Sequence, residues 1–508
     1  MNVVRRLGRL AALILCLGIL PSHADQTSAP SLRAATVIVN AQVADGTGAS
    51  LKSADVRIVA DRIARIGIFE PTKGDRVIDA KGLVLAPGFI DIHNHSAEGL
   101  PGDPLAETQI AQGITTVILG PDGFSPWPIG AWLADRRKEP AALNLALMVG
   151  HATVRKQVMG EDYERAARPG EIDQMVRLVD EAMHEGAIGL SSGLEYEVAS
   201  YSTTDEVVAL AGAAARDGGF YMTHIRDEAD KSFDALEEEI SIGERAHIPI
   251  EHSHIKLGTV KVWNKAPQFI RIIEAARKRG VDFFADCYPY DAWNSTIKVL
   301  VPDKQWKNPG SVAQALADVG GAGHVTISEF APNPGYERHT IEDLARMRGI
   351  TPVEMYIRII GEGDAATTEA GVIGQSMTES DIKAFYQQPW VLVASDGGLG
   401  SDHPRGAGTF PRVLGVFVRE KHWLTLAQAI RKMTSLPAQR LGWKDRGILR
   451  EGAFADLVLF DPKSVIDRST FANPAELPVG IDRVFVNGVI VWQDGKPTGL
   501  RPGRVLPR

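Results

Sequence analysis

Two histidines separated by one residue, His93 and His95, follow an apolar run that begins at Leu83. Side chains at positions i and i+2 of a β-strand point to the same side, so two imidazoles at a strand end can bind one metal ion. A single His-x-His pair is weak evidence for a metal site. The evidence is stronger here because further histidines follow later apolar runs of the same kind.

Alternating strands and helices make up the middle of the sequence. Eight apolar, β-branched runs are predicted to be strands, at residues 83–85, 115–119, 143–149, 187–190, 220–223, 248–250, 281–284 and 391–394. Apolar residues at helical spacing lie between many of these runs, at residues 171–185, 205–216, 233–246 and 266–279. Eight strand–helix units predict an α/β protein with a (β/α)8 barrel of the TIM type over residues 87–439.

Both sides of this region carry short patterns typical of β structure, at residues 25–86 and 440–508. We therefore expect one small β-sandwich built from both ends of the chain, with the barrel inserted into it. The stretch from about 294 to 389 separates the seventh and eighth strands and is too long for an ordinary loop. It predicts an inserted subdomain, which either covers the catalytic mouth or decorates the barrel passively.

Polar side chains gather where the predicted strands end, and barrel active sites are built at that face. Nitrogen donors suited to zinc or a similar transition metal come from four histidines: His93, His95, His224 and His254. Asp122 and Asp396 add carboxylates that could complete one or two metal sites, although a strand-end aspartate also commonly caps a helix. Other polar residues at these ends are His151, Glu195, Tyr196, Arg226, Lys256 and Asp286.

Several motifs occur in a fixed order along the chain. They are Gly-Phe-Ile-Asp-Ile-His-Asn-His at 88–95, Gly-Leu-Ser-Ser-Gly-Leu-Glu-Tyr at 189–196, Thr-His-Ile-Arg at 223–226, Ser-His-Ile-Lys at 253–256, Ser-Asp-Gly at 395–397 and His-Pro-Arg at 403–405. In these motifs the sequence resembles the amidohydrolase superfamily, and more narrowly its N-acyl-D-amino-acid deacylase (D-aminoacylase) branch. The resemblance runs from about residue 35 to the C-terminus.

The resemblance implies hydrolysis of the amide bond of N-acyl-D-amino acids, or of related D-configured peptidic substrates, by a metal-activated water. Asp396 would act as the general base and then as the general acid. The implied cofactor is zinc or another divalent metal, as one or two ions. Asp122 stands where this branch usually carries a zinc-binding cysteine, and a hard carboxylate alters metal preference, so the sequence leaves metal identity and number open.

Individual roles also follow from the resemblance. His224 and His254 would hold a firmly bound metal, and His93 and His95 would form a second, weaker position. The residues implied to contact the carbonyl or carboxylate of the substrate are Tyr196, Lys256 and Arg405. From its position alone, His151 is either a support for the metal site or a strand-end histidine with its own hydrogen bonds. Arg226 and Glu228 could steady the metal site or form a solvated salt bridge.

Two alternative functions remain open from the sequence. One is a cyclic-amide hydrolase of the same superfamily, against which Glu195 and Tyr196 count, because they stand where a carboxylated lysine would be expected. The other is a non-catalytic periplasmic binding protein that lost metal affinity through the aspartate at 122. The intact histidines and Asp396 favour an enzyme.

Composition and the N-terminus limit the partners and the compartment. A net charge of −8 without a basic stripe argues against nucleic acid, which leaves a small-molecule N-acyl amino acid as the expected partner. Arg5, Arg6 and Arg9 precede an apolar stretch, and small residues around Ala24 suit a signal peptidase. Residues 1–24 therefore predict a signal peptide, a periplasmic or secreted protein and no stable membrane insertion after cleavage. Cys287 alone would remain, so no intramolecular disulfide is expected.

Overall fold

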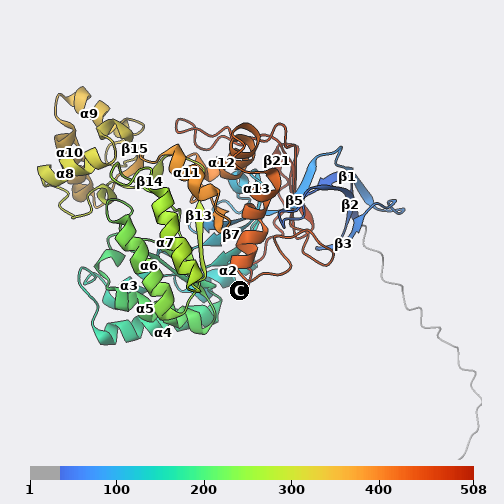
Figure 1. Ribbon diagram of the computed structural model, residues 1–508, viewed down its shortest axis with the longest axis horizontal. Helices are drawn as coiled ribbons and strands as arrows, with labels where there is room; N and C mark the ends of the chain where they lie inside the picture. The colour runs from blue at the N-terminus through green and yellow to red at the C-terminus, as the bar shows by residue number, and fades with distance from the viewer. Residues whose placement is uncertain (1–34) are drawn as a thin grey trace, which may run out of the picture. The chain divides into compact units, whose positions relative to one another are not determined.

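The computed structural model describes residues 35–508 (Figure 1). The predicted signal peptide, residues 1–24, lies outside the described residues. None of the helices between residues 35 and 508 combines the length and apolar character needed to cross a membrane.

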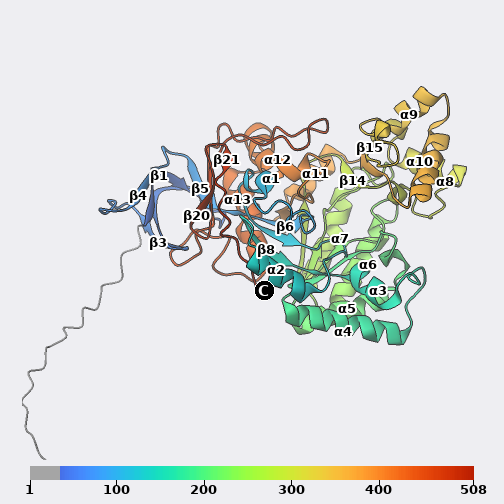
Figure 2. The ribbon, with the colours of Figure 1, turned by 180° about the vertical axis from the view of Figure 1, so that it is seen from behind.

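Both ends of the described chain build one β structure. Hydrogen bonds join nine strands into a single sheet, in which the N-terminal strand β5 pairs antiparallel with the C-terminal strand β18. The strands are β1 (Thr36–Val43), β2 (Lys52–Val59), β3 (Arg62–Gly67), β4 (Arg76–Asp79), β5 (Val84–Pro87), β18 (Leu457–Phe460), β19 (Ile481–Val486), β20 (Val489–Gln493) and β21 (Lys496–Pro497). In Figures 1 and 2 the red C-terminal strands accordingly lie beside the blue strand β5. The apolar side chains of this sheet enclose a core of their own.

Eight parallel segments form the barrel, which confirms the predicted fold class. In order they are β6 (Phe89–Asn94), β7 (Ile114–Leu119), β8 and β9 (Asn144–Leu147 and Val149–Gly150), β10 (Gly189–Gly193), β11 (Phe220–His224), β12 (Ile250–His252), β13 (Phe283–Cys287) and β17 (Val391–Val393). Two backbone hydrogen bonds close the barrel between its first and last strands, from His95 N to Gly397 O at 2.8 Å and from Asp396 N to His93 O at 3.0 Å. All other neighbours in the barrel pair in parallel.

The prediction of the first barrel strand at residues 83–85 is wrong. Val84 and Leu85 belong to β5 in the terminal sheet, Leu83 directly precedes it, and the barrel begins one strand later, at β6. The two strands form nearly continuous apolar sequence, and both are fully buried, so hydrophobicity alone does not separate them. Gly88 lies between the two strands. The backbone there passes so close to Thr115 that a Cβ would lie 2.2 Å from its side chain, so only glycine fits.

Helices surround the barrel where the sequence has helical spacing. Those of the barrel and the chain after it are α1 (Glu107–Ile110), α2 (Ile129–Lys138), α3 (His151–Met159), α4 (Pro169–Glu185), α5 (Thr204–Arg216), α6 (Ser232–Ala246), α7 (Ala266–Lys278), α11 (Glu379–Tyr386), α12 (Arg405–Arg412), α13 (Leu426–Met433) and α14 (Ser435–Arg440). Val413–Glu420 continues α12 as a π-helix. The longest barrel helices bury apolar faces, for example Met175 and Val179 of α4.

The long segment between β13 and β17 folds around a second hydrophobic core. Before α11 it contains a three-stranded antiparallel sheet and three α-helices: β14 (Trp293–Thr296), β15 (Val325–Glu329), β16 (Gly371–Gly374), α8 (Pro309–Asp318), α9 (Ile341–Arg348) and α10 (Pro352–Ala366). Figure 1 shows these yellow and orange helices grouped beside β14 and β15. Residues of β14 and of the turn after it line the cavity described below, so this segment contributes to the wall above the barrel mouth.

A buried ion pair joins two of the outer helices. The Arg155 guanidinium on α3 lies 2.5 Å from both carboxylate oxygens of Glu206 on α5, and both side chains are fully buried. His151 shares the same carboxylate at 2.9 Å. Removing one partner of a buried pair leaves an uncompensated charge, which costs more than the pair itself contributes.

We therefore expect Glu206→Ala to lower the free energy of unfolding by about 3–5 kcal/mol, measured by urea denaturation. The double variant Arg155→Met/Glu206→Leu removes both charges and should recover most of that loss. A double variant as unstable as Glu206→Ala would show that packing, rather than the unpaired charge, is responsible.

Candidate metal centre

The closure of the barrel brings the ends of its first and last strands together at one site. Because the backbones of residues 93–95 and 396–397 bond to each other, the Nε2 atoms of His93 and His95 lie 3.2 and 3.1 Å from Asp396 Oδ1. Gly398 allows this approach, since a Cβ there would lie 2.9 Å from the His95 backbone. His93 is fully buried, whereas the side chain of His95 is 40% exposed and faces the cavity.

The other two histidines come from the strands opposite. His224 is the last residue of β11, and His254 follows β12, so that His224 Nδ1 faces His254 Nε2 at 3.1 Å. The His254 ring also lies 5.0 Å from the ring of His93, centroid to centroid. The two histidine pairs predicted from the sequence therefore lie next to each other in one cluster.

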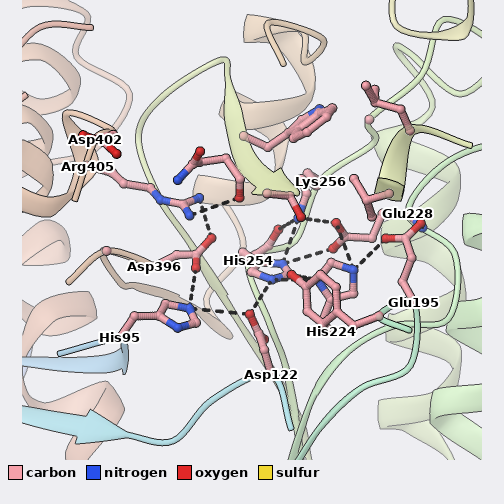
Figure 3. A pocket seen from close by; sticks show the side chains of 18 of the residues that line it. His95, Asp122, Glu195, His224, Glu228, His254, Lys256, Asp396, Asp402 and Arg405 are labelled. Carbon is pink, nitrogen blue, oxygen red and sulfur yellow. Dashed lines mark hydrogen bonds and ion pairs between the residues drawn. The ribbon is translucent and has the colours of Figure 1, made fainter. Parts of the chain in front are cut away.

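Asp122 occupies the centre of this cluster. Its Oδ2 lies 3.5 Å from His95 Nε2 and 3.6 Å from His254 Nε2 (Figure 3). The same oxygen lies 3.5 Å from His93 Nε2. Its buried Oδ1 has no hydrogen-bond partner. A buried polar atom without a partner is rare in native proteins and is one mark of an ion site.

The donor set fits a divalent transition metal. One ligand atom from each of His93, Asp122, His254 and Asp396 lies within 4.8 Å of the others, and all four residues are buried. Imidazole and carboxylate together suit zinc and similar ions. Asp122, His254 and Asp396 all have positive φ angles, of 55°, 37° and 49°, which non-glycine residues rarely adopt. Such strain gathers at functional sites.

In three of the histidines, a carboxylate lies beside the ring nitrogen that faces away from the centre of the cluster. Asp286 Oδ2 lies 3.3 Å from His93 Nδ1, Glu195 Oε2 lies 2.7 Å from His224 Nε2, and Glu228 Oε1 lies 3.0 Å from His254 Nδ1. In metal sites a carboxylate at this position fixes the tautomer that presents the other nitrogen to the ion. Sequence reasoning placed Glu195 and Asp286 at strand ends without giving them this role.

Charge within the cluster is balanced only collectively. Burial acts to raise the pKa of Asp396, but the charges of Arg405 and His254 outweigh it and hold that pKa well below the usual carboxyl range. Burial and the Lys256 ammonium act to lower the pKa of His254, yet the surrounding carboxylates raise it to about 9. Protons on the imidazoles thus balance the acids, and a divalent cation binding here would displace them.

A second group of possible ligands, His224, Glu228 and His254, already contains a positive charge. Lys256 Nζ lies 2.5 Å from Glu228 Oε2 and 2.9 Å from His254 Nδ1. The ammonium group fills the place that an ion would take between these side chains. The cluster around Asp122 is therefore the better cation site.

The predicted substrate-contacting residues also border this cluster. The Tyr196 hydroxyl lies 3.1 Å from His224 Nδ1, and Arg405 Nη1 lies 2.6 Å from Asp396 Oδ2. His151 is not brought into the cluster, because its ring bonds to Glu206 instead. Arg226 likewise pairs with Glu238 at 2.7 Å. Cys287 is buried with a raised pKa, as expected for a packing residue.

The family follows from comparison with known proteins. A model described as the amidohydrolase family matches residues 76–492, most of the chain. This chain belongs to the amidohydrolase family. It is 36% identical to a D-aminoacylase of Alcaligenes xylosoxydans xylosoxydans over 91% of this chain and 96% of that relative. It is also 36% identical to an N-acyl-D-aspartate deacylase of the same organism, over 92% and 94% of the two chains.

A solved structure of an N-acyl-D-glutamate deacylase from Bordetella bronchiseptica superposes on this amidohydrolase with a TM-score of 0.84 at 32% identity. The match covers 93% of this chain and 99% of the other. That structure is complexed with zinc and with a phosphonate inhibitor that mimics the tetrahedral intermediate of its reaction. The resemblance inferred from sequence motifs is thereby confirmed.

Measuring metal affinity tests whether the carboxylates bonded to the histidine rings support metal binding. We expect Glu195→Gln to weaken zinc binding by this amidohydrolase about 10- to 100-fold, because the amide no longer holds His224 as a charged acceptor. Competition with a chromophoric chelator measures the affinity. Glu238→Gln, which alters a carboxylate bonded to Arg226 instead, serves as the control. Equal affinities in both variants and the unaltered protein would contradict the assignment.

Proposed function

We propose that this amidohydrolase cleaves the amide bond of N-acyl-D-amino acids, or of related D-configured substrates, to a D-amino acid and a carboxylic acid. The observation that carries the proposal is the cluster of four histidines and two aspartates at the mouth of the barrel. The identity of about 36% to D-aminoacylase and N-acyl-D-aspartate deacylase over nearly the whole chain supports the substrate class.

The metal would be held by the histidines of the cluster together with Asp122: His93, His95, His224 and His254. A divalent cation bound there, zinc or a similar ion, would polarise the substrate carbonyl and lower the pKa of a bound water. One or two ions remain compatible with this donor set. Asp122 in place of the cysteine usual in this branch makes the metal preference an experimental question.

Asp396 would carry the proton in the reaction. Arg405 holds Oδ2 at 2.6 Å, which leaves Oδ1 facing the cluster. In our proposal Oδ1 accepts a proton from the attacking water and returns it to the amide nitrogen, which departs as a neutral amine. The low pKa of the carboxyl keeps it ionised before the reaction.

Three further residues would orient the substrate. The Tyr196 hydroxyl, which borders the cavity beside His224, would donate a hydrogen bond to the carbonyl oxygen. Lys256 donates to Glu228 but carries three donors, so others remain for a substrate carboxylate. Arg405 would add a second contact to that carboxylate through its remaining N–H groups.

For the whole chain we propose three parts and an exported location. Residues 1–24 would be a signal peptide, 25–86 with 440–508 a β domain, and 87–439 the catalytic barrel with its insertion at about 294–389. The charged start, the apolar stretch that follows and the small residues near Ala24 support export to the periplasm or the medium.

The substrate class is tested with matched N-acetyl-D- and N-acetyl-L-amino acids. Zinc-loaded mature protein should release free amine from the D compounds and at least about 100-fold more slowly from the L compounds, a difference of about 2.7 kcal/mol in transition-state binding. Equal rates on both enantiomers would reject the D preference. Release from neither would reject the proposed reaction.

Asp396→Asn should lower kcat by about 100- to 10,000-fold, because the amide cannot accept the proton from water. Steady-state assay of amine release measures the loss. Asp402→Asn is the matched control, since Asp402 borders the same cavity, and we expect its kcat to stay within about twofold of the unaltered protein. If the two variants behave alike, Asp396 is not the proton carrier.

A further inference from the structure

Two cavities meet at the metal cluster. His95, Asp122, Glu195 and Tyr196 border both of them. The smaller has a volume of about 390 Å³ and extends along Asp396, Lys256 and Arg405. The larger has a volume of about 800 Å³ and borders none of those three residues. A substrate with its amide at the cluster can therefore extend into two distinct spaces.

Six apolar or aromatic side chains border the larger cavity but not the smaller one: Phe124, Tyr163, Leu194, Val198, Val301 and Trp306. We call the larger cavity the apolar arm and define it by these six residues. The smaller cavity has apolar lining residues of its own, such as Trp293 and Leu300. Phe124 stands close to Asp122 in sequence and is 49% exposed, although it is a large hydrophobic residue. Its ring lies 6.4 Å from that of Tyr196. An aromatic surface thus begins directly beside the reacting centre.

Several cations that border the apolar arm are already held by partners. Lys298 lies 3.0 Å from Glu369 and 4.8 Å from the centre of the Trp306 ring. Lys304 donates a hydrogen bond of 2.6 Å to Ser200, and Arg226 pairs with Glu238. In the smaller cavity Lys256 and Arg405 are also paired, with Glu228 and Asp396, but both lie directly beside the cluster. A substrate carboxylate is better accommodated in the smaller cavity than in the apolar arm.

The proton carrier decides which half of the substrate enters which space. In the proposed reaction the amine departs beside Asp396, which borders only the smaller cavity. The amino-acid half must then lie there, with its carboxylate toward Lys256 and Arg405. The acyl group, on the other side of the scissile bond, points into the apolar arm.

We propose that the apolar arm binds a long or aromatic acyl group, so that the preferred substrates carry an apolar acyl chain of about eight carbons or an aryl ring rather than acetyl. This inference rests on the proposed function and specifies its acyl preference. Cavities of about 300–1,000 Å³ enclose ligands of drug size, whereas an acetyl group would leave the arm mostly filled with water. Each methylene buried from water strengthens binding roughly three- to fourfold.

Binding and turnover test the proposal separately. Isothermal calorimetry on the zinc-loaded protein compares octanoate with acetate, and we expect octanoate to bind at least about tenfold more tightly. Amine release is then compared for N-octanoyl, N-phenylacetyl and N-acetyl forms of one D-amino acid, with kcat/KM at least about tenfold higher for the two larger groups. Octanoate that binds no more tightly than acetate, or a kcat/KM that falls with acyl size, would overturn the proposal.

The two measurements also separate this inference from the proposed function. Tight octanoate binding without hydrolysis of any N-acyl-D-amino acid would support the apolar arm and reject the reaction. Hydrolysis of N-acetyl compounds with no gain from larger acyl groups would support the reaction and reject the apolar arm.

Two substitutions test whether the acyl group binds in the apolar arm. Phe124→Ala and Trp306→Ala should each reduce the octanoyl-to-acetyl ratio of kcat/KM at least about threefold, because each removes a wall of the arm. Met347→Ala is the control, since Met347 is an exposed apolar residue on α9 that borders neither cavity, and its ratio should be unchanged. A ratio unaffected in both wall variants would show that the acyl group lies elsewhere.

Discussion

The backbone pairing that closes the barrel positions the rest of the site. Hydrogen bonds between residues 93–95 and 396–397 fix the first strand against the last. Two buried aspartates reinforce the closure: Asp91 accepts bonds from Ser395 N and Oγ, at 2.8 and 2.5 Å, and Asp286 bonds both the His93 ring and the His254 backbone. A slip of one residue in this pairing would turn His93 and His95 away from Asp396, since alternate side chains face opposite sides of a strand.

Closure of the barrel also brings together buried charged side chains, each of which would be costly to bury alone. Burial of an unpaired carboxylate costs several kcal/mol, yet Asp122 and Asp396 are buried beside each other. The imidazoles of His93 and His254 lower the pKa of both carboxyls, and Asp286 and Glu228 lie beside those two rings in turn. The positive φ angles of Asp122, His254 and Asp396 add strain of about 1–3 kcal/mol each. Such an arrangement persists because the closed barrel leaves these residues no alternative position.

Sequence patterns predicted the barrel and the members of the cluster because both depend on local signals. Apolar runs mark buried strands, and a polar residue directly after such a run marks the catalytic face. Two features depended on contacts that no local pattern records. The run at 83–85 pairs with β18 rather than with a barrel strand, and the ion pair of Lys256 with Glu228 arises only when the chain after β11 folds against the chain after β12. His151 met the same criterion as the ligands but bonds to Glu206.

In the proposed function the cluster contacts only the amide of the substrate, so selectivity has to reside in the two cavities. Their walls come largely from loops after the barrel strands and from the inserted segment. Phe124 follows β7, Leu194 follows β10, and Trp306 belongs to the segment inserted before β17. Histidines anchored at strand ends keep their positions when such loops change, because the barrel backbone holds them. In the proposed arrangement, acyl specificity can therefore vary with these loops while the histidines at the strand ends stay in place.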